Sequence, residues 1–109
     1  MNPDDRRRFA RTNCRIRVEY SQPGAPLVAR ATATDISEGG LRALAMHQPP
    51  MNRGALLPMT LFLEDGPIKV LARLVDADPA GFAVEFSDLG LPARSRLDQL
   101  VKRAIAYRR

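Results

Sequence analysis

The chain has few of the side chains from which metal sites and disulfide bonds are made. Its 109 residues include one cysteine, Cys14, and one histidine, His47. A single thiol cannot form an internal disulfide, which fits a reducing cytoplasm, and we expect Cys14 to occupy a small apolar position in the first strand. One thiol and one imidazole are also too few for a nitrogen and sulfur metal site. We therefore predict a cytoplasmic protein without a metal or a cofactor.

Long apolar stretches are also missing. No run reaches the roughly 18 apolar residues of a membrane-spanning helix, so no membrane segment is expected. The start, Met-Asn-Pro-Asp-Asp-Arg-Arg-Arg, has no apolar segment of the kind that a secretion signal needs. The length allows one domain, residues 1–109, and the composition of 45% apolar and 27% charged residues is that of an ordinary globular protein.

A set of residues able to perform catalysis is missing as well. His47 lies near two prolines and is expected in an exposed loop rather than as a general base. Ser37 has no recognisable base partner, and Glu64 with Asp65 is explained by the chemistry of a turn. We expect no enzymatic activity.

Positive charge is concentrated at the two ends of the chain. The net charge is +5, but residues 1–17 hold six arginines against two aspartates, and residues 94–109 hold six basic residues against one aspartate. The middle of the chain, residues 18–93, carries a net charge of −4. This distribution predicts an anionic ligand or surface at the ends rather than a uniformly basic protein.

The hydrophobic pattern changes its period once along the chain. Alternating apolar and polar residues, separated by turn residues, predict five or six short strands. After Gly90, apolar residues at helical spacing predict an amphipathic helix with Pro92 in its first turn. The pattern indicates a mainly β fold, a small antiparallel barrel with a C-terminal helix packed on it.

We expect a flexible basic arm over residues 1–13, a barrel over 14–87 and a helix over 92–107. The expected strands are 14–20, 27–36, 41–46, 56–63 (buried on both faces), 68–75 and 82–86, and the apolar stripe of the helix is Leu97, Leu100, Val101, Ala104 and Ile105.

Four arginines lie close together in the N-terminal arm, at Arg6, Arg7, Arg8 and Arg11. The planar guanidinium pairs bidentately with phosphate and stacks on flat rings, so the cluster suits a ligand with phosphates and bases. A solvated charge run or a tail for any polyanion explains the same residues.

The segment Asp35-Ile36-Ser37-Glu38-Gly39-Gly40 forms a second candidate site. Asp35 and Ser37 are two residues apart at a strand end, so we expect their side chains to reach one polar ligand edge, such as the N–H donors of guanine. Gly39 and Gly40 permit a positive φ and a close approach of a base or phosphate to the backbone. An ordinary hairpin turn accounts for the same residue types.

Taken together, the two segments resemble the paired motifs of the PilZ family, R-x-x-x-R and [DN]-x-S-x-x-G. Residues 7–11 match the first motif and residues 35–40 match the second, with 23 residues between them. Residues 81–89 resemble the last strand of the family. The resemblance implies a six-stranded antiparallel split barrel with a C-terminal helix, and the bacterial second messenger cyclic di-GMP as ligand.

The resemblance also implies a role for each matched residue. Arg7 and Arg11 would hold phosphates and guanine edges, Asp35 and Ser37 would hydrogen-bond one guanine, and Gly40 would keep the backbone clear of it. Arg6 and Arg8 flank the matched arginines and would add stacking or phosphate contacts. Arg6, which precedes the motif, would favour an intercalated pair of ligand molecules. Ligand would draw the arm across the barrel, and an unidentified downstream protein would bind the altered surface.

Two other functions fit parts of the sequence. A basic barrel that binds nucleic acid fits the high pI of about 10.3. The absence of tryptophan, with only two tyrosines and four phenylalanines, argues against it, because base stacking needs exposed aromatic side chains. A PilZ domain that acts only as a protein adaptor is the other alternative, and the intact motifs argue against it.

Overall fold

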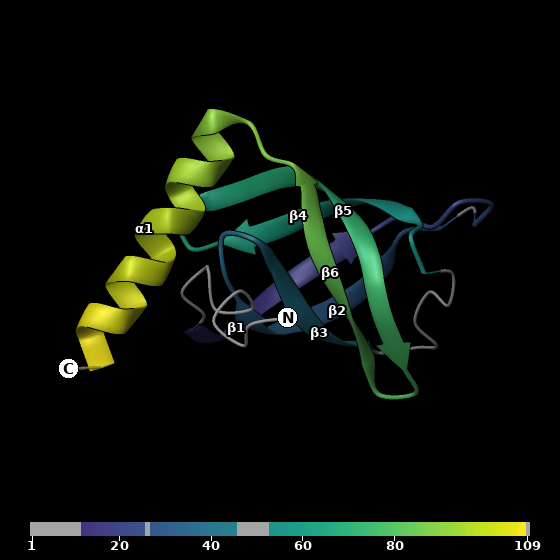
Figure 1. Ribbon diagram of the computed structural model, residues 1–109, viewed down its shortest axis with the longest axis horizontal. Helices are drawn as coiled ribbons and strands as arrows, with labels where there is room; N and C mark the ends of the chain where they lie inside the picture. Colours follow the sequence, from purple (N-terminus) through teal and green to yellow (C-terminus); the bar gives the residue numbers. More distant parts are fainter. Residues whose placement is uncertain (1–11, 26, 46–52, 109) are drawn as a thin grey trace, which may run out of the picture.

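The computed structural model describes residues 12–25, 27–45 and 53–108, the last five of these without their side chains. Six strands are followed by one helix (Figure 1). The elements are β1 (Thr12–Tyr20), β2 (Ala29–Ile36), β3 (Gly40–Ala45), β4 (Leu56–Leu63), β5 (Gly66–Asp78), β6 (Gly81–Asp88) and α1 (Leu91–Arg108).

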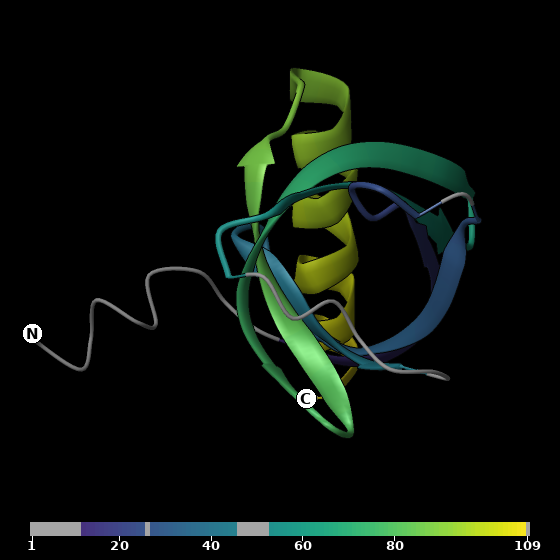
Figure 2. The same ribbon diagram turned by 90° about the vertical axis from the view of Figure 1, so that its right-hand side faces the viewer.

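The strands form a closed barrel in the order β1-β2-β3-β6-β5-β4, and every neighbouring pair is antiparallel. The predicted antiparallel barrel with a C-terminal helix is confirmed. Two views together show that α1 lies across one end of the barrel (Figures 1 and 2). Closure pairs β4 with β1, and it leaves the barrel without the unpaired strand edges that promote aggregation.

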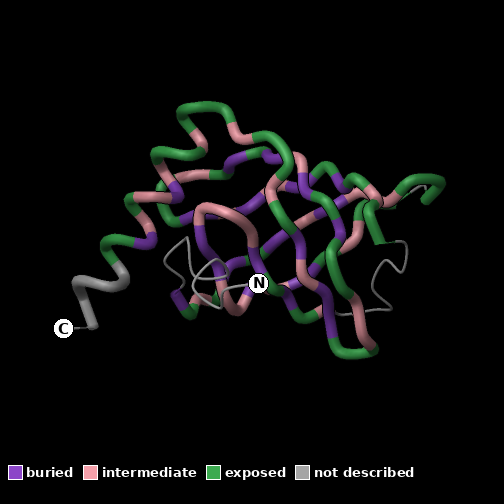
Figure 3. Tube along the Cα trace, viewed as in Figure 1, coloured by how far each residue is buried: buried purple, intermediate pink, exposed green. Residues whose placement is uncertain are grey.

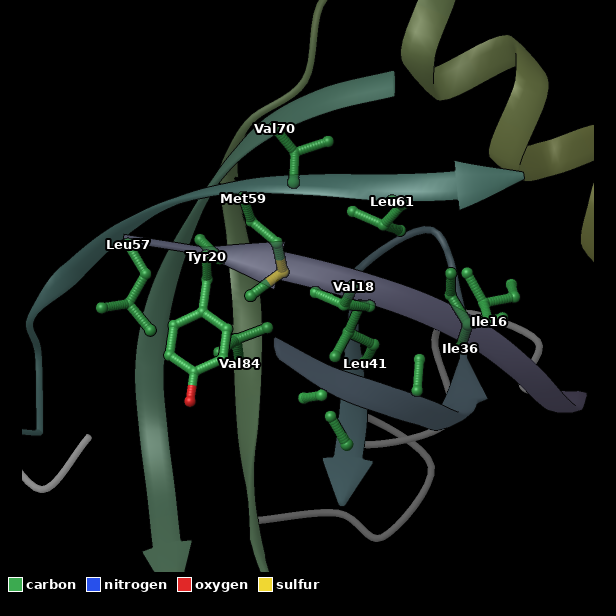
Figure 4. Close-up of a cluster of buried hydrophobic side chains, with 14 of the residues drawn as sticks. Ile16, Val18, Tyr20, Ile36, Leu41, Leu57, Met59, Leu61, Val70 and Val84 are labelled. Atoms are coloured by element: carbon green, nitrogen blue, oxygen red, sulfur yellow. The ribbon is translucent and has the colours of Figure 1, made fainter. Parts of the chain in front are cut away.

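Buried and more exposed positions alternate along the strands (Figure 3), and the buried residues are almost all apolar. Val18, Leu61 and Ile36 are fully buried, and side chains from β1, β4 and β6 point toward one another in the core (Figure 4). The ring of Tyr20 meets that of Phe82 edge-on, with their centroids 5.0 Å apart. The core is therefore a packed interior rather than a ligand cavity.

Strand β4 has the predicted bounds, but the prediction that both of its faces are buried is wrong. Its residues alternate between buried and more exposed, because no second layer covers the outside of the barrel. Pro58 lies in the strand with its carbonyl accepting from the Ser21 N–H at 3.0 Å. In a strand the N–H and C=O groups of one residue point to the same neighbouring strand. The side on which Pro58 lacks an N–H therefore faces the end of β1.

Several strands extend further than the alternation predicted. Strand β1 begins at Thr12, which is buried, so residues 12 and 13, predicted to belong to the arm, are part of this strand. Strand β5 continues to Asp78, and the turn after it consists of Pro79 and Ala80 alone. The Asp78 carboxylate accepts hydrogen bonds from Ala80 and Gly81 N–H, at 2.8 and 2.9 Å, and so caps this tight turn itself. The loop that holds His47 lies outside the described residues.

Helix α1 packs by a short apolar stripe and one arginine anchor. Leu97 and Val101 are buried, and the side chains of Ala104 and Ile105, predicted to extend the stripe, lie outside the described part of the chain. Arg96 donates to the Asp65 carboxylate at 2.6 Å and to the carbonyls of Gly66 and Pro67 at 2.6 and 3.2 Å. The β4–β5 turn thereby holds the helix on the barrel. Within the described residues, no helix combines the length and the apolar character needed to span a bilayer.

Replacing Arg96 by alanine should loosen α1 from the barrel. The Arg96 side chain is 27% exposed, and losing its three bonds should lower the free energy of unfolding by about 1–2 kcal/mol. Urea unfolding followed by circular dichroism measures this change. Arg103→Ala, an exposed position on the same helix, is the matched control and should have a much smaller effect. Equal stability of the Arg96 variant and the wild type would contradict the anchoring role.

Candidate functional site

The candidate site has two halves, and the structure describes one of them. The arginine cluster, Arg6, Arg7, Arg8 and Arg11, lies outside the described residues. The chain enters the described part at Thr12, which pairs with Ile36, and Asn13 pairs with Asp35. The strand that continues from the arginine cluster therefore lies directly beside the Asp35–Gly40 segment.

The Ser37 hydroxyl is used inside the β2–β3 turn. The side chain is 6% exposed, and its oxygen accepts from the Gly39 N–H at 3.1 Å and donates to the Gly40 carbonyl at 3.4 Å. The Ser37 N–H donates to the same carbonyl at 2.9 Å. Ser37 thus shapes the turn through its own hydrogen bonds, as serine commonly does in turns.

Glycine is required in this turn for a structural reason that the sequence did not indicate. Gly39 and Gly40 do not use the positive φ that glycine permits, because the described glycines with a positive φ are Gly24, Gly54 and Gly66. A Cβ atom on Gly40 would instead overlap the Val84 carbonyl oxygen of the paired strand β6. The Gly39 carbonyl accepts from the Phe86 N–H at 2.9 Å, which continues this close pairing. Gly40 is therefore required by the packing of β3 on β6, whatever it does for a ligand.

Asp35 lies on β2 at the centre of three strands. It is half-buried, and its cross-strand partners are Asn13 on β1 and Arg42 on β3.

Cys14 follows Asn13 and donates to the Ala33 carbonyl at 3.4 Å. Burial, and then the negative charge of Asp35, raise the pKa of the Cys14 thiol to about 11. This neutral, half-buried thiol agrees with a packing role for Cys14.

Glu38 connects the turn to the C-terminal helix. Its carboxyl group hydrogen-bonds the Asp98 carboxyl group, which raises the pKa of Glu38 and lowers that of Asp98. Lys102 lies 3.0 Å from Asp98, one helical turn further along the same face. The β2–β3 turn therefore lies close to α1 at Glu38, while the β4–β5 turn holds the helix through Arg96.

Sequence reasoning missed Arg42 and the Glu38–Asp98 contact. Arg42 could have been found, because Asp35 and Arg42 are equally far from the centre of the predicted hairpin turn and therefore lie opposite each other. The Glu38–Asp98 contact has no such signal, since it depends on where the helix packs. Among the described residues, no group of three or more metal-binding side chains is present.

The comparisons with known proteins agree on one family. The sequence matches the family model described as PilZ domain over residues 5–103. No curated protein matches the chain.

Solved structures share the fold at low sequence identity. The inhibitor of motility MotI/DgrA from Bacillus subtilis has a TM-score of 0.82 and 19% identity, over 94% of this chain and 53% of its own. The PilZ domain of YcgR from Escherichia coli, solved with c-di-GMP, has a TM-score of 0.76 and 16% identity, over 95% of each chain. The MrkH–c-di-GMP complex from K. pneumonia has a TM-score of 0.77 and 18% identity, over 93% of this chain and 53% of its own. The chain thus spans about half the length of MotI and MrkH.

Cys14 should react slowly with iodoacetamide in the folded protein. With a pKa of about 11, its thiolate fraction at pH 8 is about a hundredfold lower than in an unfolded chain, and the thiolate is the reactive form. We expect alkylation at least about tenfold slower in buffer than in urea, and Asp35→Asn should speed the native reaction by removing a negative charge. The chain has one cysteine, so mass spectrometry gives an unambiguous rate. Equal rates in buffer and in urea would contradict the protected thiol.

Proposed function

The chain belongs to the PilZ domain family, and on that premise we propose that it is a receptor for cyclic di-GMP. The observation that carries the proposal is the pairing of Thr12, the residue that follows Arg11 in the sequence, with Ile36 in the second motif segment. This pairing supports a site that combines both motifs of the family. The YcgR PilZ domain and MrkH, which share this fold, were both solved in complex with this ligand.

The ligand chemistry divides between the two halves of the site. Cyclic di-GMP carries two phosphates, which suit the guanidinium groups of Arg7 and Arg11, with Arg6 and Arg8 adding phosphate or stacking contacts. The carboxylate of Asp35 accepts hydrogen bonds, and the edge of guanine offers N–H donors to it. The phosphates would thus lie opposite guanidinium groups, and the N–H donors of guanine would lie opposite a carboxylate.

Ser37, Gly39 and Gly40 have a less direct part in the proposed site. A bond from the Ser37 hydroxyl to guanine would replace one of its two bonds within the turn. Gly39 and Gly40 leave no side chain over the turn, so the base can approach the backbone. We therefore assign the main ligand contact of this turn to Asp35 and its shape to Ser37 and Gly40.

The proposed output is a change of surface on ligand binding. Charge-assisted hydrogen bonds from the arginines to the phosphates would draw residues 1–11 over the ligand, and the bonds would offset the lost chain entropy. A downstream protein would then bind the new surface. Because Glu38 connects the ligand turn to Asp98, helix α1 is suited to be part of that surface.

Wild-type protein should bind cyclic di-GMP with about micromolar or tighter affinity in a calorimetric titration, and GTP and linear pGpG should bind much more weakly. Arg7→Ala and Asp35→Ala should each weaken binding at least about tenfold, because each removes a charged hydrogen-bonding partner. Glu64→Ala, an exposed carboxylate in the β4–β5 turn, is the matched control and should bind like the wild type.

Two outcomes would contradict the receptor function. A folded wild type without saturable binding of cyclic di-GMP would leave the adaptor function. Tighter binding to random oligonucleotides than to cyclic di-GMP, falling steeply with salt, would favour a nucleic-acid-binding protein.

Ligand should also change the amide NMR signals of residues 1–11. We expect these signals to shift and gain protection from exchange on addition of cyclic di-GMP, and Arg11→Ala should abolish the change by removing a phosphate contact. Arg103→Ala removes the same charge from α1 and should leave the change intact. An Arg11 variant whose arm responds like that of the wild type would contradict closure of the arm.

A further inference from the structure

A row of outward-facing residues crosses four strands next to the β2–β3 turn. Asn13, Asp35, Arg42 and Ala83 are cross-strand partners on β1, β2, β3 and β6. The residues before and after Arg42 on β3 are buried, while Arg42 itself is exposed, so it points out of the barrel. Residues paired in register share a face of the sheet, and therefore Asp35 and Arg42 are neighbours on the outer surface, with the Arg42 guanidinium directed to Asp78 on the far side of β6.

Arg42 has a contact that a ligand can replace. Its guanidinium lies 3.0 Å from one carboxylate oxygen of Asp78, and the two side chains are 47% and 44% exposed. Exposed ion pairs of this kind contribute little to stability. The other oxygen of Asp78 accepts from Ala80 and Gly81 N–H, so the β5–β6 turn keeps its cap without Arg42. Arg42 can therefore leave Asp78 without unfolding the hairpin.

Two residues with little or no side chain lie beside Arg42 on the outer surface. Gly40, two residues before Arg42 on the same face of β3, has no side chain, and Ala83 opposite Arg42 has only a methyl group. Ala83 thus leaves space above the sheet on the β6 side of Arg42, whereas the Cβ direction of Gly40 is taken up by the Val84 carbonyl oxygen. A flat purine ring that approaches Asp35 and Arg42 meets no bulky side chain at Gly40 or Ala83.

We propose that Asp35 and Arg42 together form a guanine-specific pair, an inference that rests on the proposed cyclic di-GMP receptor function. Guanine presents its N1 and N2 donors next to its O6 and N7 acceptors along one side of the ring. A carboxylate accepts from the donors, and an arginine donates bidentately to O6 and N7. Directly opposite residues have Cβ atoms about 5 Å apart, a spacing that suits two adjacent edges of one base.

Adenine is excluded by the same pair. It has an acceptor at N1 and a donor at N6, so the carboxylate would meet an acceptor and the guanidinium would keep only N7 as an acceptor. A charged group left without a hydrogen-bonding partner in the complex costs binding free energy. A site can therefore discriminate between similar ligands by leaving such groups unpaired in the wrong complex. The arginines of the N-terminal arm remain for the phosphates, and Arg42 supplies the choice of base.

The test compares affinity for cyclic di-GMP and cyclic di-AMP in calorimetric titrations. Arg42→Ala should weaken cyclic di-GMP binding by about tenfold and reduce the preference over cyclic di-AMP by a similar factor. Arg42→Lys should also lose preference, because an ammonium lacks the planar fork. Arg30→Ala is the matched control: Arg30 is an exposed arginine on β2, 3.6 Å from Glu19 and outside the row, and its loss should leave affinity and preference unchanged.

Asp78→Asn separates ligand binding from a structural role of the ion pair. The asparagine oxygen still accepts from the turn amides, but the attraction to Arg42 is weakened, so cyclic di-GMP should bind equally well or more tightly. Weaker binding by this variant, to the extent seen for Arg42→Ala, would overturn the inference in favour of a structural pair. Equal behaviour of Arg42→Ala and Arg30→Ala would also overturn it. A wild type that fails to bind cyclic di-GMP would overturn the proposed function itself.

Discussion

The pairing of β1 with β4 is the contact on which the rest of the molecule depends. It joins Val18, Glu19 and Tyr20 to Leu61, Thr60 and Met59, and it closes the barrel between two strands far apart in the sequence. Closure encloses the apolar core and removes the two sheet edges that an open form would expose. It also fixes β1, whose first residues lie beside the β2–β3 turn. The geometry of the candidate site is therefore a consequence of how the barrel closes.

The fold was predictable because its signals are local. Alternation, together with short apolar runs bounded by turn residues, located every strand, β4 with the observed bounds, and the helical spacing of Leu97 and Val101 located the helix. The end of β5 was missed, because Asp76 and Asp78 have turn-forming side chains while pairing with β6 keeps them in the strand. For the candidate site, the motif residues could be named from the sequence, but the packing of Gly40 on Val84 joins segments more than 40 residues apart, and nothing local to Gly40 reports it.

Helix α1 is attached to the barrel through two turns with different character. At the β4–β5 turn, Arg96 makes three direct bonds, two of them to backbone carbonyls that cannot move without the strands. At the β2–β3 turn, the contact is between the Glu38 and Asp98 carboxyl groups, which are near the surface and respond to neighbouring charge. The firm attachment is remote from the motif residues, and the adaptable one is within the motif.

The alternation of buried and outward residues divides each strand of the barrel into two independent sets. On β3, Leu41 and Ala43 fill the interior, while Arg42 between them faces outward. Substitutions in the second set leave the packed interior untouched, so recognition can be altered by evolution, or by design, at little cost in stability. A barrel with a filled interior carries its specificity on the outside, and a change of ligand in such a protein requires new surface side chains rather than a new cavity.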